Sequence, residues 1–189
     1  MNKCRTLVAI SGLVFLAGWG TTVAENEKPP IPYYDHGACP FECCTYREWT
    51  ATTETALRKD FNDSSPVVST VKPKEQVRGV TGVVITTKAG PVKILKAQSL
   101  QRENGKDKVS LKPGDILYNL HYVGAGYDKL WFKGQLLVDQ TDIRKIEKNE
   151  WWEVIDLPAW VWWAKIQRPN GEAGWTRELK NFQHIDKCE

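Results

Sequence analysis

Four cysteines, three near the beginning of the chain and one at its end, limit the folds open to this sequence. Cys39, Cys43 and Cys44 lie within six residues, and Cys188 is the last residue but one of 189. A bridge between the adjacent Cys43 and Cys44 needs a strained ring, which makes it the least favoured of the three possible pairings. Both other pairings join one cysteine of the cluster to Cys188. We therefore expect two disulfides and an N-terminal segment that is tied to the C-terminus.

The first 24 residues have the three parts of a secretory signal. Lys3 and Arg5 supply positive charge, an apolar run extends from Leu7 to Trp19, and Thr22-Val23-Ala24 offers a cleavage site. The run is shorter than the roughly 18 apolar residues expected of a membrane-spanning anchor. We expect cleavage after Ala24, which removes Cys4 and leaves an even set of cysteines. The mature protein is then periplasmic or secreted, with no membrane span.

The charge balance of the mature chain excludes a strongly basic protein. The full sequence has 26 basic and 23 acidic residues, and loss of Lys3 and Arg5 with the signal leaves a formal charge of +1. Nucleic-acid binding and strong attachment to a membrane surface both require a basic patch, so neither is expected. The remaining length suits one domain or two small ones.

The segment from His36 to Cys44 has a second interpretation as a metal site. One histidine and the three thiolates of Cys39, Cys43 and Cys44 are enough for a tetrahedral zinc shell. The segment lacks a C-x-x-C pair, however, and thiols outside the cytoplasm oxidise readily. Disulfides are therefore the favoured interpretation over a metal or free, redox-active thiols, and we expect no metal and no cofactor.

Short β-prone runs separated by turn residues predict an all-β fold. A single helix, short and charged, is expected over residues 141–150. The expected strands cover residues 67–71, 76–87, 92–95, 116–123, 130–138, 160–166 and 173–176.

Glycines mark where these strands turn or bend. Lys133-Gly134 and Asn170-Gly171 each predict a tight hairpin. Gly79 and Gly82 predict bends or bulges within the long strand that contains them. In the strand over residues 160–166, tryptophans alternate on both faces, and we expect only one of the faces to be buried readily.

Three segments resemble parts of bacterial SH3-like domains. Trp163-Ala-Lys-Ile166, the Asn170-Gly171 turn and Gly174-Trp175 resemble their closing hairpin. Residues 57–83 are similar in outline to the opening of such a domain, and Lys112-Pro113-Gly114-Asp115 before Ile116-Leu117-Tyr118 repeats its turn and strand. The resemblance covers about residues 46–182. It departs from the family in an insertion at 139–159 and in the cysteine cluster ahead of the first strand.

The resemblance implies one or two small SH3-like β-barrels. With two barrels, which the repeated turn and strand favour, the expected parts are the signal at 1–24, an extended lead-in with the cysteine cluster at 25–45, barrels at 46–100 and 107–182, and a tail at 183–189. The alternative is one elaborated barrel whose closing hairpin comes from the C-terminal part of the chain.

Ten aromatic residues between Tyr118 and Trp163 are candidates either for core packing or for a binding groove. A small barrel buries part of such a set as core and leaves the rest for the insertion, a partner or a ligand. The groove candidates are Tyr122, Tyr127, Trp131, Trp152 and Trp160. SH3-like domains are reported to bind peptidoglycan or peptides. We therefore expect a non-enzymatic binding module of the cell envelope, or alternatively a secreted inhibitor or adaptor that binds a protein.

Covalent catalysis is the third interpretation. Cys43 or Cys44 with His121 would form the nucleophile and base of a cell-wall hydrolase. The sequence has no G-x-S-x-G, H-E-x-x-H or P-loop motif, and the β-rich chain leaves little room for a separate catalytic domain. We expect no enzymatic activity.

The disulfide and hydrolase interpretations differ in one measurable quantity. If both disulfides form, titration of the unreduced mature protein with a thiol reagent finds no free thiol. One or more reactive thiols at Cys43 or Cys44 would instead restore the hydrolase interpretation.

Overall fold

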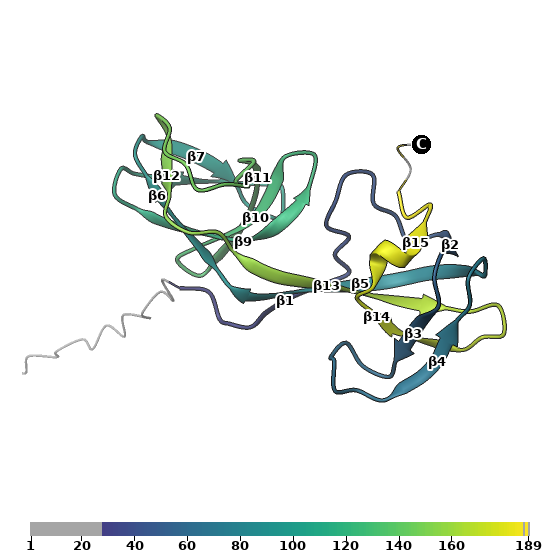
Figure 1. The fold of residues 1–189 in the computed structure, drawn as a ribbon. Coiled ribbons are helices and arrows are strands. Elements are labelled where there is room, and N and C mark those ends of the chain that lie inside the picture. Colours follow the sequence, from purple (N-terminus) through teal and green to yellow (C-terminus); the bar gives the residue numbers. More distant parts are fainter. Residues whose placement is uncertain (1–27, 187, 189) are drawn as a thin grey trace, which may run out of the picture.

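The protein consists of β-strands arranged in two lobes, and two long strands of the first lobe lead into the second (Figure 1). The structure is a computed structural model that describes residues 28–186 and residue 188, so the predicted signal and Cys4 lie outside the described residues. Within these residues no α-helix occurs, and the single helical element is a short 3-10 turn, η1 (Leu179–Asn181). The predicted all-β fold is therefore confirmed.

The first lobe is an eight-stranded antiparallel sheet that curls into a half-barrel. The order along the sheet is β15-β2-β5-β13-β14-β3-β4, and β1 pairs with β5 beside β2. The strands are β1 (Tyr33–His36), β2 (Glu48–Ala51), β3 (Thr55–Arg58), β4 (Val67–Val71), β5 (Gln76–Lys88), β13 (Ala159–Gln167), β14 (Ala173–Thr176) and β15 (Phe182–Gln183).

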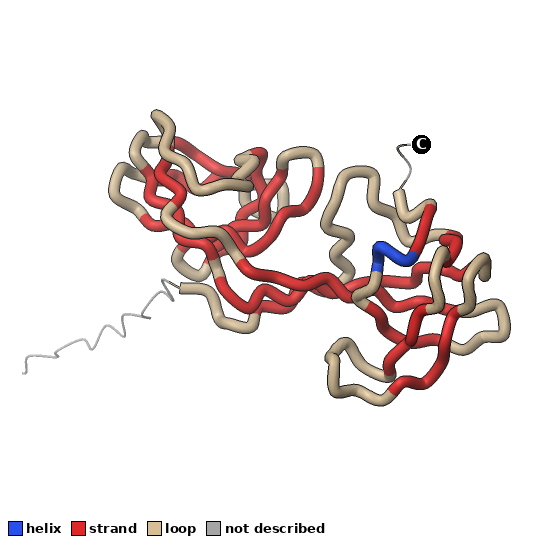
Figure 2. Tube along the Cα trace, in the orientation of Figure 1, coloured by secondary structure: helices blue, strands red, loops and turns tan. Residues whose placement is uncertain are grey.

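The second lobe is formed by the chain between β5 and β13 (Figure 2). Its five-stranded sheet has the order β11-β10-β9-β6-β12, and β7 pairs with β8 in a separate hairpin. The strands are β6 (Gly90–Ile94), β7 (Gln98–Gln101), β8 (Lys108–Leu111), β9 (Ile116–Gly124), β10 (Tyr127–Phe132), β11 (Gln135–Gln140) and β12 (Trp152–Val154).

This pairing places the predicted C-terminal hairpin, β13 and β14, on the sheet of the first lobe. β13 pairs with β5 and β14 pairs with β3. The sequence predicts a first barrel at residues 46–100, a range that includes β6 and β7. In the structure these two strands belong to the second lobe. The second lobe is thus inserted into the first, and the chain crosses between them twice.

Each lobe has its own hydrophobic core. In the first core, side chains from both ends of the chain pack around the fully buried Trp49, including Leu57, Val84, Trp162 and Phe182. The second core is contributed by residues 92–154, with Leu117, Leu130 and Leu137 fully or almost fully buried. The first core is therefore built from long-range contacts and the second from a continuous stretch of chain.

The aromatic side chains of the first core require glycine on β5. A Cβ atom at Gly79 would lie 2.7 Å from the Trp49 ring, and one at Gly82 would lie 2.5 Å from Nε1 of Trp162. The register of β13 against β5 shifts between Lys165 and Ile166, opposite Gly79. The predicted irregularity is confirmed at Gly79, whereas the register at Gly82 is regular and this glycine admits the close approach of Trp162.

Both faces of β13 are buried at its centre, so the expectation of one buried face was wrong. Trp162 packs in the first core, while its neighbour Trp163 points to the opposite face and is only 3% exposed. β13 lies between β5 and β14 instead of at an edge of the sheet. The guanidinium of Arg177 lies 5.9 Å from the Trp163 ring and contributes to its cover.

The helix predicted over residues 141–150 does not form, and that prediction was wrong. The carboxylate of the buried Asp128 accepts hydrogen bonds from Oγ1 of Thr141 at 2.7 Å and from the backbone N–H of Ile143 at 2.9 Å. Between them Asp142 adopts a positive φ of 50°. A ten-residue helix has only marginal stability by itself, so these tertiary hydrogen bonds determine the conformation of the segment.

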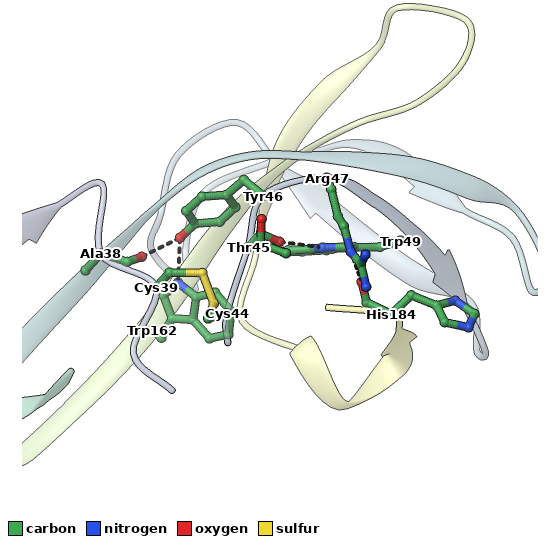
Figure 3. Close-up of a disulfide and its surroundings, with 9 residues drawn as sticks. All are labelled: Ala38, Cys39, Cys44, Thr45, Tyr46, Arg47, Trp49, Trp162 and His184. Atoms are coloured by element: carbon green, nitrogen blue, oxygen red, sulfur yellow. Dashed lines mark hydrogen bonds between the residues drawn. A yellow bond between two sulfur atoms is a disulfide. The ribbon is translucent and has the colours of Figure 1, made fainter. Parts of the chain in front are cut away.

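The cysteines pair as Cys39–Cys44 and Cys43–Cys188, which confirms the predicted tie between the start of the domain and its end. Figure 3 shows the first bridge beside Tyr46, whose hydroxyl donates to the Ala38 carbonyl and accepts from Nε1 of Trp162 at 3.2 Å. Burial raises the pKa of Tyr46 to about 12. The cysteine segment is therefore anchored on the first core.

Removing the two bridges separately is expected to have unequal effects on stability. Cys43–Cys188 spans 145 residues and Cys39–Cys44 spans 5. In the chain-entropy model, loss of the long bridge lowers the free energy of unfolding by about 5 kcal/mol and loss of the short one by about 2 kcal/mol. Urea denaturation of the two double Cys→Ser variants measures both values. Equal losses would contradict this account.

Candidate functional site: a cleft between the lobes

An apolar cleft with aromatic side chains lies where the two lobes meet. Tyr122 from β9 and Trp160 from β13 line it, so two of the five predicted groove residues come together. The cleft has a volume of about 280 Å³. We call it the aromatic cleft; its other lining residues are Asn119, Asp128, Ile143, Arg144, Leu157 and Pro158.

Trp160 is the exposed aromatic ring of this cleft. It pairs with Thr86 of β5, next to a shift of register between Ala159 and Trp160. Its side chain is 38% exposed, although Trp162, two residues further along the strand, is buried in the first core. Trp160 stands where β13 leaves the first lobe, so its ring is available for contact with a ligand.

Tyr122 is held by an arginine from the insertion. Nη2 of Arg144 donates to the Tyr122 hydroxyl at 2.9 Å, and its guanidinium lies 4.3 Å from the centre of the ring. The hydroxyl also accepts a hydrogen bond from the backbone of Gly126 at 3.1 Å. Asp142 pairs with Arg144 at 2.6 Å. This wall of the cleft therefore presents an ordered ring with a cation stacked on it.

Two buried polar residues lie at the base of the cleft. Burial raises the pKa of Asp128 despite its hydrogen bonds from Ile143, Thr141 and Asn119. Nδ2 of Asn119 donates to Asp128 at 3.4 Å and to the Ile143 carbonyl at 3.3 Å. Within the described part of the chain, the buried Oδ1 of Asn119 has no hydrogen-bond partner. It is an unused acceptor beside an apolar cleft.

The other three predicted groove residues do not line this cleft. Tyr127 is exposed at the start of β10, where it pairs with Gly124 and Gln140. Trp131 is half-buried further along the same strand. Trp152 is half-buried on β12 and packs against the second core. The structure thus brings together Tyr122 and Trp160 and places the others on separate parts of the second lobe.

A cluster of charged residues joins the lobes next to the aromatic cleft. Oδ2 of Asp35, on β1, lies 2.9 Å from Nε2 of His121 and 2.7 Å from Nζ of Lys129. Lys129 also pairs with Glu103 at 2.8 Å. We call Asp35, Glu103, His121 and Lys129 the interlobe ionic cluster. It lines a second, open cleft of about 370 Å³ next to the Cys39 segment.

Mutual pairing governs the ionisation of this cluster. Burial would raise the pKa of Asp35, but hydrogen bonds from His121 and Lys129 outweigh it and hold the pKa below its ordinary value of 3.8. Burial would lower the pKa of Lys129, but its bonds to Asp35 and Glu103 raise the pKa above 10.5. Both groups are therefore charged at neutral pH.

The residues of the hydrolase interpretation have other partners in the structure. The hydrolase interpretation needs a thiol at Cys43 or Cys44, and both sulfur atoms are in disulfides. His121 contacts Asp35 and the Tyr122 carbonyl instead of a cysteine. Over residues 28–186 and 188, no three His, Cys, Asp or Glu side chains are grouped to hold a metal ion.

Several residues of the two clefts were not predicted from the sequence. Arg144 and Leu157 both belong to the insertion at 139–159, for which the sequence predicted only a cover over exposed tryptophans. Asp35 lies in the lead-in, 86 residues from His121. No local pattern marks such a pair, because only the fold brings the two residues together.

No family model, curated protein or solved structure matches this chain. The described residues also contain no helix that is long and apolar enough to cross a membrane. The disulfides indicate an oxidising environment outside the cytoplasm.

The lowered pKa of Asp35 predicts a loss of stability in acid. A group with a lowered folded pKa stabilises the fold above its unfolded pKa, and this contribution is lost as the pH falls through the folded value. In Asp35→Asn, the free energy of unfolding should fall by about 1.5–3 kcal/mol at pH 7, since a hydrogen-bonded charge is removed. The gap between the variant and wild type should begin to narrow below about pH 4 and should close only below the lowered folded pKa of Asp35.

Urea denaturation between pH 7 and pH 3 measures this difference. Asp60→Asn, a change at an exposed carboxylate, is the control and should follow wild type throughout. A constant gap between Asp35→Asn and wild type down to pH 3 would contradict the ionic account of the cluster.

Proposed function

We propose that this protein is an exported, non-enzymatic binding module of the cell envelope, and that its aromatic cleft binds peptidoglycan or peptides. The observation that carries the proposal is the partly exposed ring of Trp160 opposite an ordered Tyr122 in an apolar cleft. Small-molecule and peptide sites are mostly concave and apolar, with a few polar groups that fix orientation.

The lining of the cleft suits a ligand with one flat apolar face and at least one hydrogen-bond acceptor. Trp160, Leu157 and Pro158 offer apolar surface to a sugar ring or an amino-acid side chain. The exposed guanidinium of Arg144, another lining residue, can donate to a carbonyl or hydroxyl oxygen of a ligand. Sugar rings and peptide stems of the cell wall carry both features.

The setting of the cleft supports a role outside the cytoplasm. Two disulfides persist in the periplasm or after secretion. The predicted signal at 1–24 would deliver the chain there. A secreted inhibitor or adaptor would use the same aromatic surface for a protein partner, and binding to purified cell walls separates it from the proposed function.

We further propose that the lobes are two SH3-like barrels, one inserted into the other. The half-barrel sheet of the first lobe and the separate core of the second are compatible with this interpretation. In this arrangement the hairpin of β13 and β14 closes the first barrel, and residues 90–157 form the second.

Truncation of Trp160 tests the proposed function. In a pull-down on purified cell walls, wild type should be retained and Trp160→Ala should bind about tenfold more weakly or worse, because buried aromatic anchors dominate such interfaces. Trp151→Ala is the matched control: its ring is 36% exposed, and it lies outside the cleft under the cation of Lys96. Retention of this control should equal that of wild type.

Two outcomes would overturn the proposal. If wild type is not retained, peptidoglycan is not the ligand. If both tryptophan variants lose retention equally, the aromatic cleft is not the binding site.

A further inference from the structure

His121 lies between the interlobe ionic cluster and the aromatic cleft. Its side chain is 1% exposed on β9. Nε2 is 2.9 Å from Oδ2 of Asp35, and Nδ1 is 2.8 Å from the backbone carbonyl of Tyr122. The imidazole therefore connects β1 of the first lobe to the residue whose ring forms one wall of the aromatic cleft.

Both neighbours of the imidazole are hydrogen-bond acceptors. A backbone carbonyl can only accept. The Asp35 carboxylate also only accepts when ionised, and burial, which would raise its pKa, is outweighed by its bonds from His121 and Lys129. A neutral imidazole has one N–H and can satisfy only one of the two contacts. The geometry is satisfied by the doubly protonated imidazolium.

The ring of His121 also contacts the other wall of the cleft. Its centroid lies 6.1 Å from that of the Trp160 ring, with the planes at 60° in an edge-to-face arrangement. A single buried side chain thus touches Trp160 through its ring and Tyr122 through its Nδ1 atom. His121 is therefore in contact with one residue from each wall.

Other charges around His121 balance an imidazolium. Lys129 of β10 is paired in register with His121, and Glu103 reaches Lys129 from the loop after β7. With Asp35 from β1, the cluster holds two carboxylates, one ammonium and the imidazole. It is neutral when His121 is protonated and carries one negative charge when His121 is not. Tyr33 adds no charge at neutral pH, since burial raises its pKa.

We propose that His121 is a positioning residue for the aromatic cleft, and that its imidazolium form holds Tyr122 and Trp160 in the binding arrangement. This inference rests on the proposed function of the cleft. When the second proton leaves, the remaining one stays on Nε2 toward the Asp35 carboxylate. The lone pair of Nδ1 then faces the Tyr122 carbonyl, and this repulsive contact displaces the cleft wall. Ligand binding is therefore stronger with His121 as the imidazolium than with the neutral ring.

The first arm of the test needs no ligand. Ring-nitrogen NMR of ¹⁵N-histidine-labelled protein is recorded between about pH 5 and pH 8, where histidine changes charge. We expect His121 to carry protons on both nitrogens at the acid end and to lose the Nδ1 proton as the pH rises. The indole signal of Trp160 and the amide signal of Tyr122 should shift with the same midpoint. His36→Gln removes an exposed histidine and should leave these shifts unchanged.

The second arm uses a pair of variants that keep one hydrogen-bond donor each. In His121→Asn, the side-chain amide replaces the Nδ1 donor to Tyr122; in His121→Gln, it replaces the Nε2 donor to Asp35. Affinity for soluble peptidoglycan fragments should fall about three- to tenfold from pH 5 to pH 8 in wild type, the effect of one hydrogen bond. It should be independent of pH in both variants, and higher in His121→Asn than in His121→Gln.

The two arms separate failure of this inference from failure of the proposed function. If no fragment binds at any pH while Trp160 and Tyr122 follow the titration of His121, the ligand proposal fails and the positioning role stands. If their signals do not follow His121, the inference is overturned whether or not the variants fold. It is also overturned if fragments bind wild type with an affinity that does not change with pH.

Discussion

The antiparallel pairing of β5 with β13 is the interaction on which the rest of the structure depends. It runs from Lys88 opposite Ala159 to Arg78 opposite Gln167, and it joins two segments about as far apart in sequence as a small domain is long. At one end its side chains form the first core around Trp162. At the other end it leads into the second lobe. Without this pairing, neither the half-barrel nor the approach of the two lobes exists.

The same pairing places the candidate site. Trp160 is exposed because it lies where β13 emerges from the first lobe, next to the shift of register. Opposite it, Tyr122 belongs to β9 of the inserted lobe, which touches both β5 and β13. The buried ionic contact from Asp35 to His121 and Lys129 then fixes one lobe against the other. The candidate site, made from both lobes, thus lies beside polar contacts that are sensitive to ionisation.

Local features of this fold could be predicted from the sequence, whereas the pairing of distant segments could not. Three such features were predicted correctly. Local residue preferences marked the strand over residues 67–71 and the Lys133-Gly134 hairpin. The small number of possible cysteine pairings predicted the tie to Cys188. The helix predicted at 141–150 does not form, because the backbone N–H of Ile143 donates a hydrogen bond to Asp128 of β10. Tyr122 and Trp160 were predicted by residue type. Arg144, which contacts Tyr122, was not, since a cation–aromatic contact with an insertion leaves no periodic signal.

The inserted topology also explains why the long disulfide matters to this fold. The segment between β5 and β13 is a loop of about 70 residues, and closing it costs conformational entropy before the first core can form. The second core is contributed by that segment alone, so its folding can shorten the effective loop. The Cys43–Cys188 bridge brings the two outer ends together in the unfolded chain as well. Both features therefore lower the conformational entropy lost when β5 pairs with β13. The inserted lobe shortens the loop between the two strands, and the disulfide joins the chain segments that lie outside them.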